Sequence, residues 1–273
     1  MIIDGKYQSV IDTVLNKLKD FDEIDAVLLS GSITTGTIDE FSDIDLYLYL
    51  NRDLSVEKRT TFIQDISSYC EVNNQFWETE DCFIMKDSGI KVEIMYRSYS
   101  WIEEQLTRIL ENYQAGVGYS TCFCRNFLES KILLDNTHRF SSLQQRFTID
   151  YPLELQKNII EKNLPLLMEI QSSYFNQIAL AVKRDDFISI NHRVSAYLES
   201  YFDILFAINK LYHPGEKKLY KTVRKDCSHI PEKFEADIKE LLQQNPSTIL
   251  ETIRSLTENI ETIAKKILSL NLL

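Results

Sequence analysis

One stretch decides the fold: residues 28–46 read LLSGSITTGTIDEFSDIDL. The pattern predicts a strand at Ala26–Ser30 that runs into Gly31-Ser32, and a second strand, Asp43–Leu50, after a turn rich in hydroxyl groups. A glycine lets the backbone approach a ligand closely, and a short helix that begins near Ser32 aims free N–H groups and its positive dipole end at an anion. This arrangement suits a phosphate group.

The second strand opens with an Asp-x-Asp pair. Residues two apart in a strand point to the same face, so Asp43 and Asp45 lie together while the alternating apolar residues face the core. Two carboxylates with no counter-cation beside them repel each other unless they share a metal ion. Oxygen ligands favour Mg²⁺, which takes one or two protein carboxylates together with water and substrate phosphates. The pair therefore predicts a Mg²⁺ site.

A third carboxylate is expected from a neighbouring strand. In Ile90–Tyr96 the apolar residues alternate, which leaves Glu93 on the polar face. A turn at Lys86–Gly89 makes this strand the second arm of a hairpin with Cys82–Lys86. Asp81 is the competing candidate, but it lies at the edge of its strand without such alternation. Glu93 is therefore the predicted third acid.

Composition bounds the fold class. The chain of 273 residues is 44% hydrophobic and 26% charged, as in soluble globular proteins, and its seven Gly and five Pro argue against an all-β fold. Strand patterns end near residue 145. We predict an α+β fold, in which an N-terminal mixed β-sheet domain with flanking helices over residues 1–145 precedes an all-α helical bundle over residues 146–273.

Helices are expected at Tyr7–Leu18 and Val56–Tyr69 in the first part and at Arg193–Tyr212 in the second. Pro152 is expected in the first turn of a helix. Three further helices are expected after the later prolines, Pro214, Pro231 and Pro246.

Charge and cysteine content limit the partners and the compartment. The chain opens with no basic-then-apolar leader and has no long apolar stretch, so we expect a cytoplasmic protein without a membrane partner. Five cysteines, an odd number, indicate reduced thiols.

The net charge of −11 comes entirely from the first half of the chain, because residues 1–150 hold 14 basic and 25 acidic residues and residues 151–273 hold 16 of each. An acidic first half repels a phosphate backbone and disfavours a nucleic-acid partner.

The acidic pattern resembles a known family. Gly31-Ser32, ten intervening residues, Asp43-x-Asp45 and a later strand acid are similar to the nucleotidyltransferase superfamily of DNA polymerase beta. The length and two-domain layout are similar to bacterial small-molecule nucleotidyltransferases, the lincosamide and aminoglycoside adenylyltransferases and their uncharacterised relatives. The resemblance implies that Asp43, Asp45 and Glu93 are the catalytic and metal-binding residues. Since the family often has an aspartate as third acid, Glu93 is left open as metal ligand, base or both.

The resemblance also implies a reaction. One or two Mg²⁺ ions and ATP, or another nucleoside triphosphate, are expected at the site, and AMP or another nucleoside monophosphate would move to a hydroxyl of a small molecule with release of pyrophosphate. The acceptor could be an antibiotic, which would make the chain an antibiotic-resistance enzyme. Gly31 and Ser32 would cradle the phosphates, and Ser42 would touch phosphate or metal.

A basic cluster in the second half is a candidate clamp on the polyphosphate, at Lys217, Lys218 and Lys221. If residues 216–225 form one helix, Lys217, Lys221 and Arg224 share a face. A solvated basic face explains the same pattern equally well.

Two other functions stay open. In the first, the same site modifies a protein partner, as in toxin–antitoxin nucleotidyltransferases, although those are usually shorter than this chain. In the second, the chain is a regulatory nucleotide-binding module without turnover, although a dead site has no need of three mutually repelling acids. The acceptor, the nucleobase and a homo-oligomeric state are not determined by the sequence.

Overall fold

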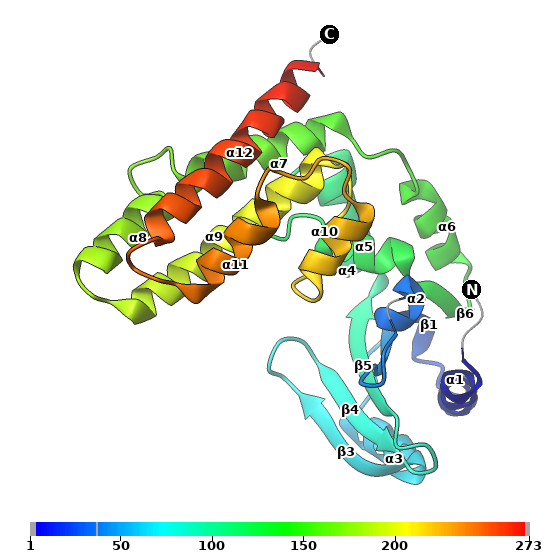
Figure 1. Ribbon diagram of the computed structural model, residues 1–273. Helices are drawn as coiled ribbons and strands as arrows, with labels where there is room; N and C mark the ends of the chain where they lie inside the picture. Colours follow the sequence, from blue (N-terminus) through cyan, green and yellow to red (C-terminus); the bar gives the residue numbers. More distant parts are fainter. Residues whose placement is uncertain (1–3, 37, 271–273) are drawn as a thin grey trace. The chain divides into compact units, whose positions relative to one another are not determined.

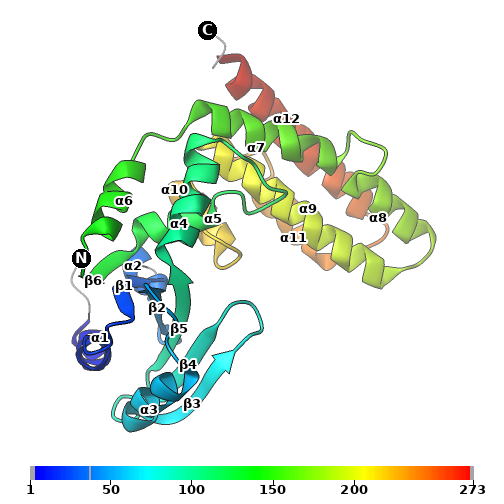
Figure 2. The same cartoon turned by 180° about the vertical axis from the view of Figure 1, so that it is seen from behind.

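A computed structural model of the chain describes residues 4–36 and 38–270 (Figures 1 and 2). It divides into two compact units. The first comprises the residues up to Leu106 together with Asn126–Thr148, and the second comprises Thr107–Arg125 together with the residues from Ile149 onward. The segment Thr107–Arg125 thus precedes residue 145 in the sequence but packs with the second unit. The domain boundary expected at residues 145 and 146 stays a prediction.

The first unit is a mixed sheet with flanking helices, which confirms the predicted α+β class. Its elements are α1 (Gly5–Leu18), β1 (Ile24–Ser30), α2 (Ser32–Thr35), β2 (Ile44–Leu50), α3 (Val56–Ile66), β3 (Ser67–Asn74), β4 (Glu80–Met85), β5 (Lys91–Ser98), α4 (Tyr99–Leu106), β6 (Lys131–Asp135) and α6 (Arg139–Phe147).

In the part of the chain that the structure describes, the sheet has six strands in the order β3-β4-β5-β2-β1-β6. The pair β2–β5 is parallel, and the other neighbouring pairs are antiparallel. Leu29, Leu46 and Ile94 on one face form a buried cluster with Val14 of α1 and Ile63 of α3. These helices thus cover the apolar face, as the alternation in β2 and β5 predicts.

Helices also cover part of the opposite face. Tyr49 of β2 packs against Phe140 of α6, with ring centroids 4.7 Å apart, and against Phe127, with centroids 6.2 Å apart. Phe127 belongs to α5 (Cys122–Glu129), which passes from the second unit into the first. The polar end of this face, near the start of β2, carries the acids described below.

In this unit the predicted end of one helix is wrong, and one strand was not predicted. The helix expected at Val56–Tyr69 ends at Ile66, because residues from Ser67 onward pair with β4 as the strand β3. The strand β6 was not expected, since its residues KILLD lack period-two alternation; pairing with β1 extends them. In both places pairing with a neighbouring strand outweighs local propensity.

The second unit is helical. Its elements are η1 (Thr107–Glu111, a π-helix), α7 (Leu153–Leu167), α8 (Tyr174–Lys183), α9 (Phe187–Ile208), α10 (Leu219–Asp226), α11 (Phe234–Gln243) and α12 (Ile249–Leu270), and it also holds the start of α5. The described helices include none with the length and apolar character of a membrane span. The five cysteines are free thiols, as predicted.

The prolines act largely as predicted in this unit. Pro152 is the residue that caps the start of α7, and α10, α11 and α12 follow the three later prolines. The helix expected at Arg193–Tyr212 begins earlier, at Phe187, where the Asp186 side chain accepts a hydrogen bond from the Ser189 N–H at 2.9 Å. It ends at Ile208, so Tyr212 lies outside it.

A buried carboxylate holds the loop before α5 onto the helical unit. Asp203 of α9 is 1% exposed and accepts hydrogen bonds from the Ser120 N–H at 3.0 Å and the Ser120 hydroxyl at 2.6 Å. The Asn163 side chain donates to the same carboxylate at 3.3 Å. Burial raises the pKa of Asp203 to about 6, although the hydrogen bonds from Ser120 lower it.

We expect Asp203 to make the free energy of unfolding depend on pH. Its pKa is about 6 in the folded chain against an ordinary value of 3.8, so the folded state binds more protons between these values. The stabilisation is fully present below the unfolded pKa and is lost, by roughly 3 kcal/mol, as the pH rises through the folded pKa. Chemical denaturation at a series of pH values measures the loss. The loss of stability with rising pH should be smaller by roughly 3 kcal/mol in Asp203→Asn. An identical pH profile in that variant would show that Asp203 does not cause the loss.

Candidate active site

Three carboxylates meet at one end of the parallel pair β2–β5. Asp43 directly precedes β2, Asp45 is the second residue of that strand, and Glu93 is the register partner of Asp45 in β5. One carboxylate oxygen of each residue lies within 4.8 Å of the other two, and each residue is partly buried. We call these three residues the acidic triad. The spacing lets a single divalent cation reach all three carboxylates.

Gly31 is required where the triad meets β1. Ser30, the last residue of β1, is the register partner of Asp45, and Gly31 follows with a φ of 72°. A Cβ atom at position 31 would lie 1.8 Å from Oδ2 of Asp45. Because no side chain fits there, the residue must be glycine if the Asp45 carboxylate is to keep its place.

Ser32 begins α2, which is a single turn of four residues. Its hydroxyl oxygen is buried and has no hydrogen-bond partner among the described residues. An unsatisfied buried hydroxyl is unfavourable, and a phosphate oxygen bound beside Gly31 would satisfy it. The single turn contributes little macrodipole, so the predicted phosphate contact would depend on Gly31 and Ser32 themselves.

Ser42 closes the turn before β2. Its hydroxyl accepts a hydrogen bond from the Asp39 N–H at 2.9 Å and donates to the Asp39 carboxylate at 3.1 Å. These bonds position the chain that leads into Asp43. Contact of Ser42 with a phosphate or a metal stays a prediction.

A positive charge that the sequence analysis did not consider lies beside Glu93. The ammonium group of Lys91, two residues before Glu93 in β5, donates a hydrogen bond to Oε1 of Glu93. This bond with Glu93 raises the pKa of Lys91. Residues two apart in a strand share a face, so the sequence contained the signal for this contact, although Lys91 was given no role there.

A further acid lies on the face that carries Glu93. In the pairing of β4 with β5, Cys82 is opposite Glu93, and Glu80 lies two residues along β4 on the same side of the sheet. Burial, and next the charge of Glu93, raise the pKa of Glu80. This part of the sheet therefore favours positively charged groups over anions.

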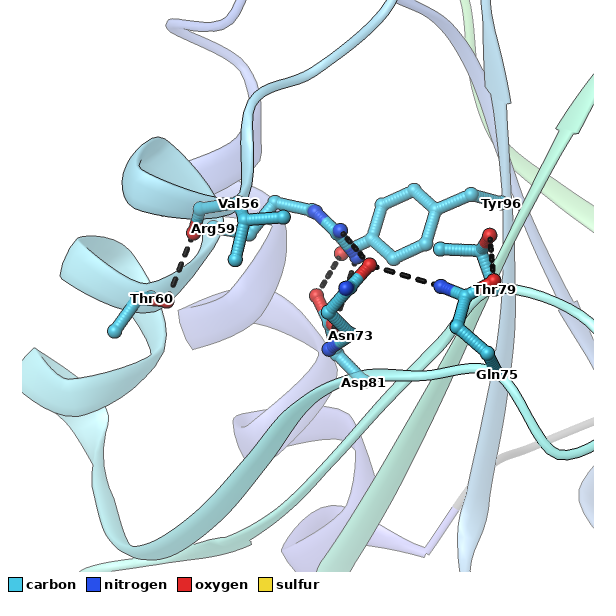
Figure 3. A network of polar contacts seen from close by, with 8 residues as sticks. All are labelled: Val56, Arg59, Thr60, Asn73, Gln75, Thr79, Asp81 and Tyr96. Carbon is cyan, nitrogen blue, oxygen red and sulfur yellow. Dashed lines mark hydrogen bonds and ion pairs between the residues drawn. The ribbon is translucent and has the colours of Figure 1, made fainter.

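Asp81, the competing candidate for the third acid, lies on the face of the sheet opposite to Glu93, where its carboxylate is buried and hydrogen-bonded (Figure 3). Arg59 reaches from α3 to its carboxylate at 2.8 Å, the Tyr96 hydroxyl donates to it at 2.6 Å, and the Asn73 N–H donates at 2.8 Å. Asp81 is 0% exposed and the Arg59 side chain 4%. The residue therefore joins α3 to the β3–β4 hairpin and is separate from the triad.

We expect Asp81→Asn to lower the free energy of unfolding by about 3 to 5 kcal/mol, because it leaves the buried Arg59 charge without its counter-charge. Asp65→Asn is the matched control. Asp65 forms an ion pair with Lys17 in which both side chains are exposed and the charges are screened by solvent, so its loss should cost much less than that of Asp81. Urea denaturation measures both variants, and equal losses would contradict the structural role of Asp81.

Gly31→Ala tests the close contact with Asp45. The new methyl group must displace the carboxylate, so we expect the affinity of the triad for Mn²⁺ to fall about tenfold or more. Gly36→Ala is the control, since Gly36 has a similar φ of 69° but no atom within 4 Å of a Cβ there. Both variants carry backbone strain of about 1 to 2 kcal/mol, but only the first should lose metal affinity. Equal Mn²⁺ affinities, measured by titration, would show that the clash is relieved without moving Asp45.

The predicted helix over residues 216–225 is wrong at its start. Glu216–Lys218 form a turn and α10 begins at Leu219, so Lys217 lies outside the helix that carries Lys221. Lys218 caps the start of α10 in a left-handed conformation, with a φ of 57°. These lysines belong to the second unit and the triad to the first. A role of Lys217, Lys218 and Lys221 in phosphate binding stays a prediction.

Comparisons with known proteins place the triad in a family. Residues 12–96, which include Gly31 and all three acids, match the family described as polymerase beta, nucleotidyltransferase. Residues 124–219 match a domain of unknown function, DUF4037. A search of curated proteins found no match.

Two solved structures are similar to this chain. A nucleotidyltransferase-like protein from Exiguobacterium sibiricum 255-15 is 11% identical over 95% of this chain and 75% of its own, with a TM-score of 0.43. A STING-associated CdnE c-di-GMP synthase from Capnocytophaga granulosa is 14% identical over 97% of this chain and 81% of its own, with a TM-score of 0.29. The family match covers residues 12–96 and the triad lies inside it, so this part of the chain is a polymerase beta-like nucleotidyltransferase domain.

Proposed function

We propose that this chain is a Mg²⁺-dependent nucleotidyltransferase that moves AMP, or another nucleoside monophosphate, from a nucleoside triphosphate to a hydroxyl of a small molecule. The observation that carries the proposal is the acidic triad itself. Carboxylate oxygens of Asp43, Asp45 and Glu93, from two adjacent strands, lie within 4.8 Å of one another beside Gly31.

The residues present fit a divalent ion and a triphosphate. The atoms that would bind the metal are carboxylate oxygens, which suit a hard cation such as Mg²⁺. The buried hydroxyl of Ser32, without a partner among the described residues, fits a phosphate oxygen. When bound, Mg²⁺ supplies positive charge that neutralises the phosphates and the leaving pyrophosphate.

The reaction needs positioning and proton transfer from the protein. Asp43 and Asp45 hold the ion, and Gly31 and Ser32 hold the phosphates. The acceptor oxygen forms a bond to the α-phosphorus as the bond from that phosphorus to the bridging oxygen breaks and pyrophosphate leaves. Glu93 lies at the edge of the triad as a ligand, as the base that takes the hydroxyl proton, or as both.

Charge supports a small acceptor. Residues 1–150 carry 25 acidic and 14 basic residues, and Glu80 lies beside Glu93 on the face of the sheet that carries the triad. Such a surface disfavours a long polyanionic acceptor and favours a neutral or cationic one. Aminated hydroxyl compounds, a class that includes antibiotics, fit this requirement.

The test is transfer of label from α-labelled ATP to a library of hydroxyl compounds in the presence of Mg²⁺. We expect transfer by the natural chain and a loss of about 100-fold or more in Asp43→Asn and Asp45→Asn, because each removes a charge that holds the ion. Glu71→Gln is the control. Glu71 is an exposed acid on β3 outside the triad, and its variant should keep the activity.

The result is read from where the label enters. Label in small solutes supports the proposal, whereas label in protein from a cell lysate would replace it with a protein-modifying enzyme. Binding of ATP without transfer to any acceptor would identify a regulatory module instead. If Asp43→Asn transfers label as fast as the natural chain, the triad is not the active site.

A further inference from the structure

Lys91 places a positive charge directly on the triad. Its ammonium group is hydrogen-bonded to Oε1 of Glu93, which is the register partner of Asp45. The Lys91 side chain is 47% exposed and that of Glu93 is 18% exposed, so the pair lies at the edge of the site. Two residues apart in β5, they share one face, and the strand itself keeps them together.

The neighbours of this pair are acidic. Glu80 lies on the same face, and Glu93 is the first charged group that raises its pKa. The Glu93 side chain thus faces Asp45 on β2, Lys91 on its own strand, and Cys82 and Glu80 on β4. Without Lys91, three carboxylates would converge with only a metal ion to balance them.

The charges of the site add up to a definite number of ions. The three ionised carboxylates of the triad and the Lys91 ammonium group carry a charge of about −2 between them, which one divalent cation neutralises, and Glu80 beside Glu93 adds to the negative charge when it is ionised. A second divalent cation would make the site positive and would be repelled by the ammonium group only a few ångströms away. Lys91 and a second ion would therefore compete for the Glu93 carboxylate, because their positive charges repel each other.

We propose that Lys91 is a built-in counter-cation of the triad, which positions Glu93 and limits the nucleotide-free chain to one divalent ion at this site. The inference rests on the proposed function, because it assumes that the triad binds divalent ions. Lys91 acts through Glu93 and is a positioning residue. It supplies the charge that a second ion would otherwise bring.

The experiment counts Mn²⁺ ions bound to the full chain without nucleotide, by electron paramagnetic resonance of the free ion. We expect one Mn²⁺ at the triad of the natural chain and two in Lys91→Met, the first bound roughly fivefold more tightly because a repelling charge is gone. Lys91→Arg should bind one ion, as the natural chain does.

Lys86→Met is the matched control. Lys86 precedes β5 in the same hairpin, but its ammonium group donates to the backbone oxygens of Gln64 and Asp65, at 3.0 and 2.8 Å. Its removal should leave the number and affinity of the ions unchanged. Lys91→Gln replaces Lys91→Met if the latter does not fold.

A second readout needs no activity. In a chelator, Lys91→Met should melt at a lower temperature than the natural chain, because Glu93 has lost the ammonium group that is hydrogen-bonded to it, and added Mn²⁺ should close the gap. Lys91→Arg should melt with the natural chain under both conditions.

The outcomes separate this inference from the proposed function. Two ions in the natural chain, or one ion of unchanged affinity in Lys91→Met, overturns the role of Lys91 and leaves the proposed function intact. No Mn²⁺ in the natural chain, or binding that persists undiminished in Asp45→Asn, overturns the metal site and with it both proposals.

Discussion

The parallel pairing of β2 with β5 is the constraint on which the site depends. It sets Asp45 opposite Glu93 and, one residue further, Leu46 opposite Ile94, both of which are buried in the core. A slip of one residue would turn an acid into the core and an apolar residue out to solvent, at a cost of more than 1 kcal/mol for each misplaced side chain. The hydrophobic core therefore enforces the position of the third acid, although 40 residues of chain, from residue 51 to residue 90, separate the two strands.

The structure gives similar acids opposite roles through their surroundings. Asp81 is buried and takes three hydrogen bonds, one of them from Arg59, so its charge is used to hold α3 to the sheet. The triad is only partly buried, and Lys91 offsets one of its three charges. Gly31 leaves room for the Asp45 carboxylate at a position where any Cβ would clash with it. Carboxylates that are left partly uncompensated in this way are suited to bind a cation and not to stabilise the fold.

Period-two alternation was enough to predict the fold class and the convergence of Asp43, Asp45 and Glu93, because each strand that carries them has one fully apolar face. Other features depend on contacts distant in sequence. Pairing with β4 makes the residues after Ile66 a strand instead of more helix, and pairing with β1 makes Lys131–Asp135 a strand. Lys218 has a left-handed conformation, so α10 begins only at Leu219. The bond between Lys91 and Glu93 is local and could have been predicted from their shared face. The assignment of Thr107–Arg125 to the second unit could not have been predicted, because it depends on buried contacts between residues distant in sequence, such as that of Ser120 with Asp203.

The most direct test of the account is to locate the metal ion. Crystals of the full chain with Mn²⁺ and a non-hydrolysable ATP analogue, measured by anomalous diffraction, show where the ion lies and which atoms bind it. The account predicts an ion bonded to carboxylate oxygens of Asp43 and Asp45, with the triphosphate beside Gly31 and Ser32. A nucleotide bound elsewhere, or a triad with no ion in the presence of bound nucleotide, would contradict it.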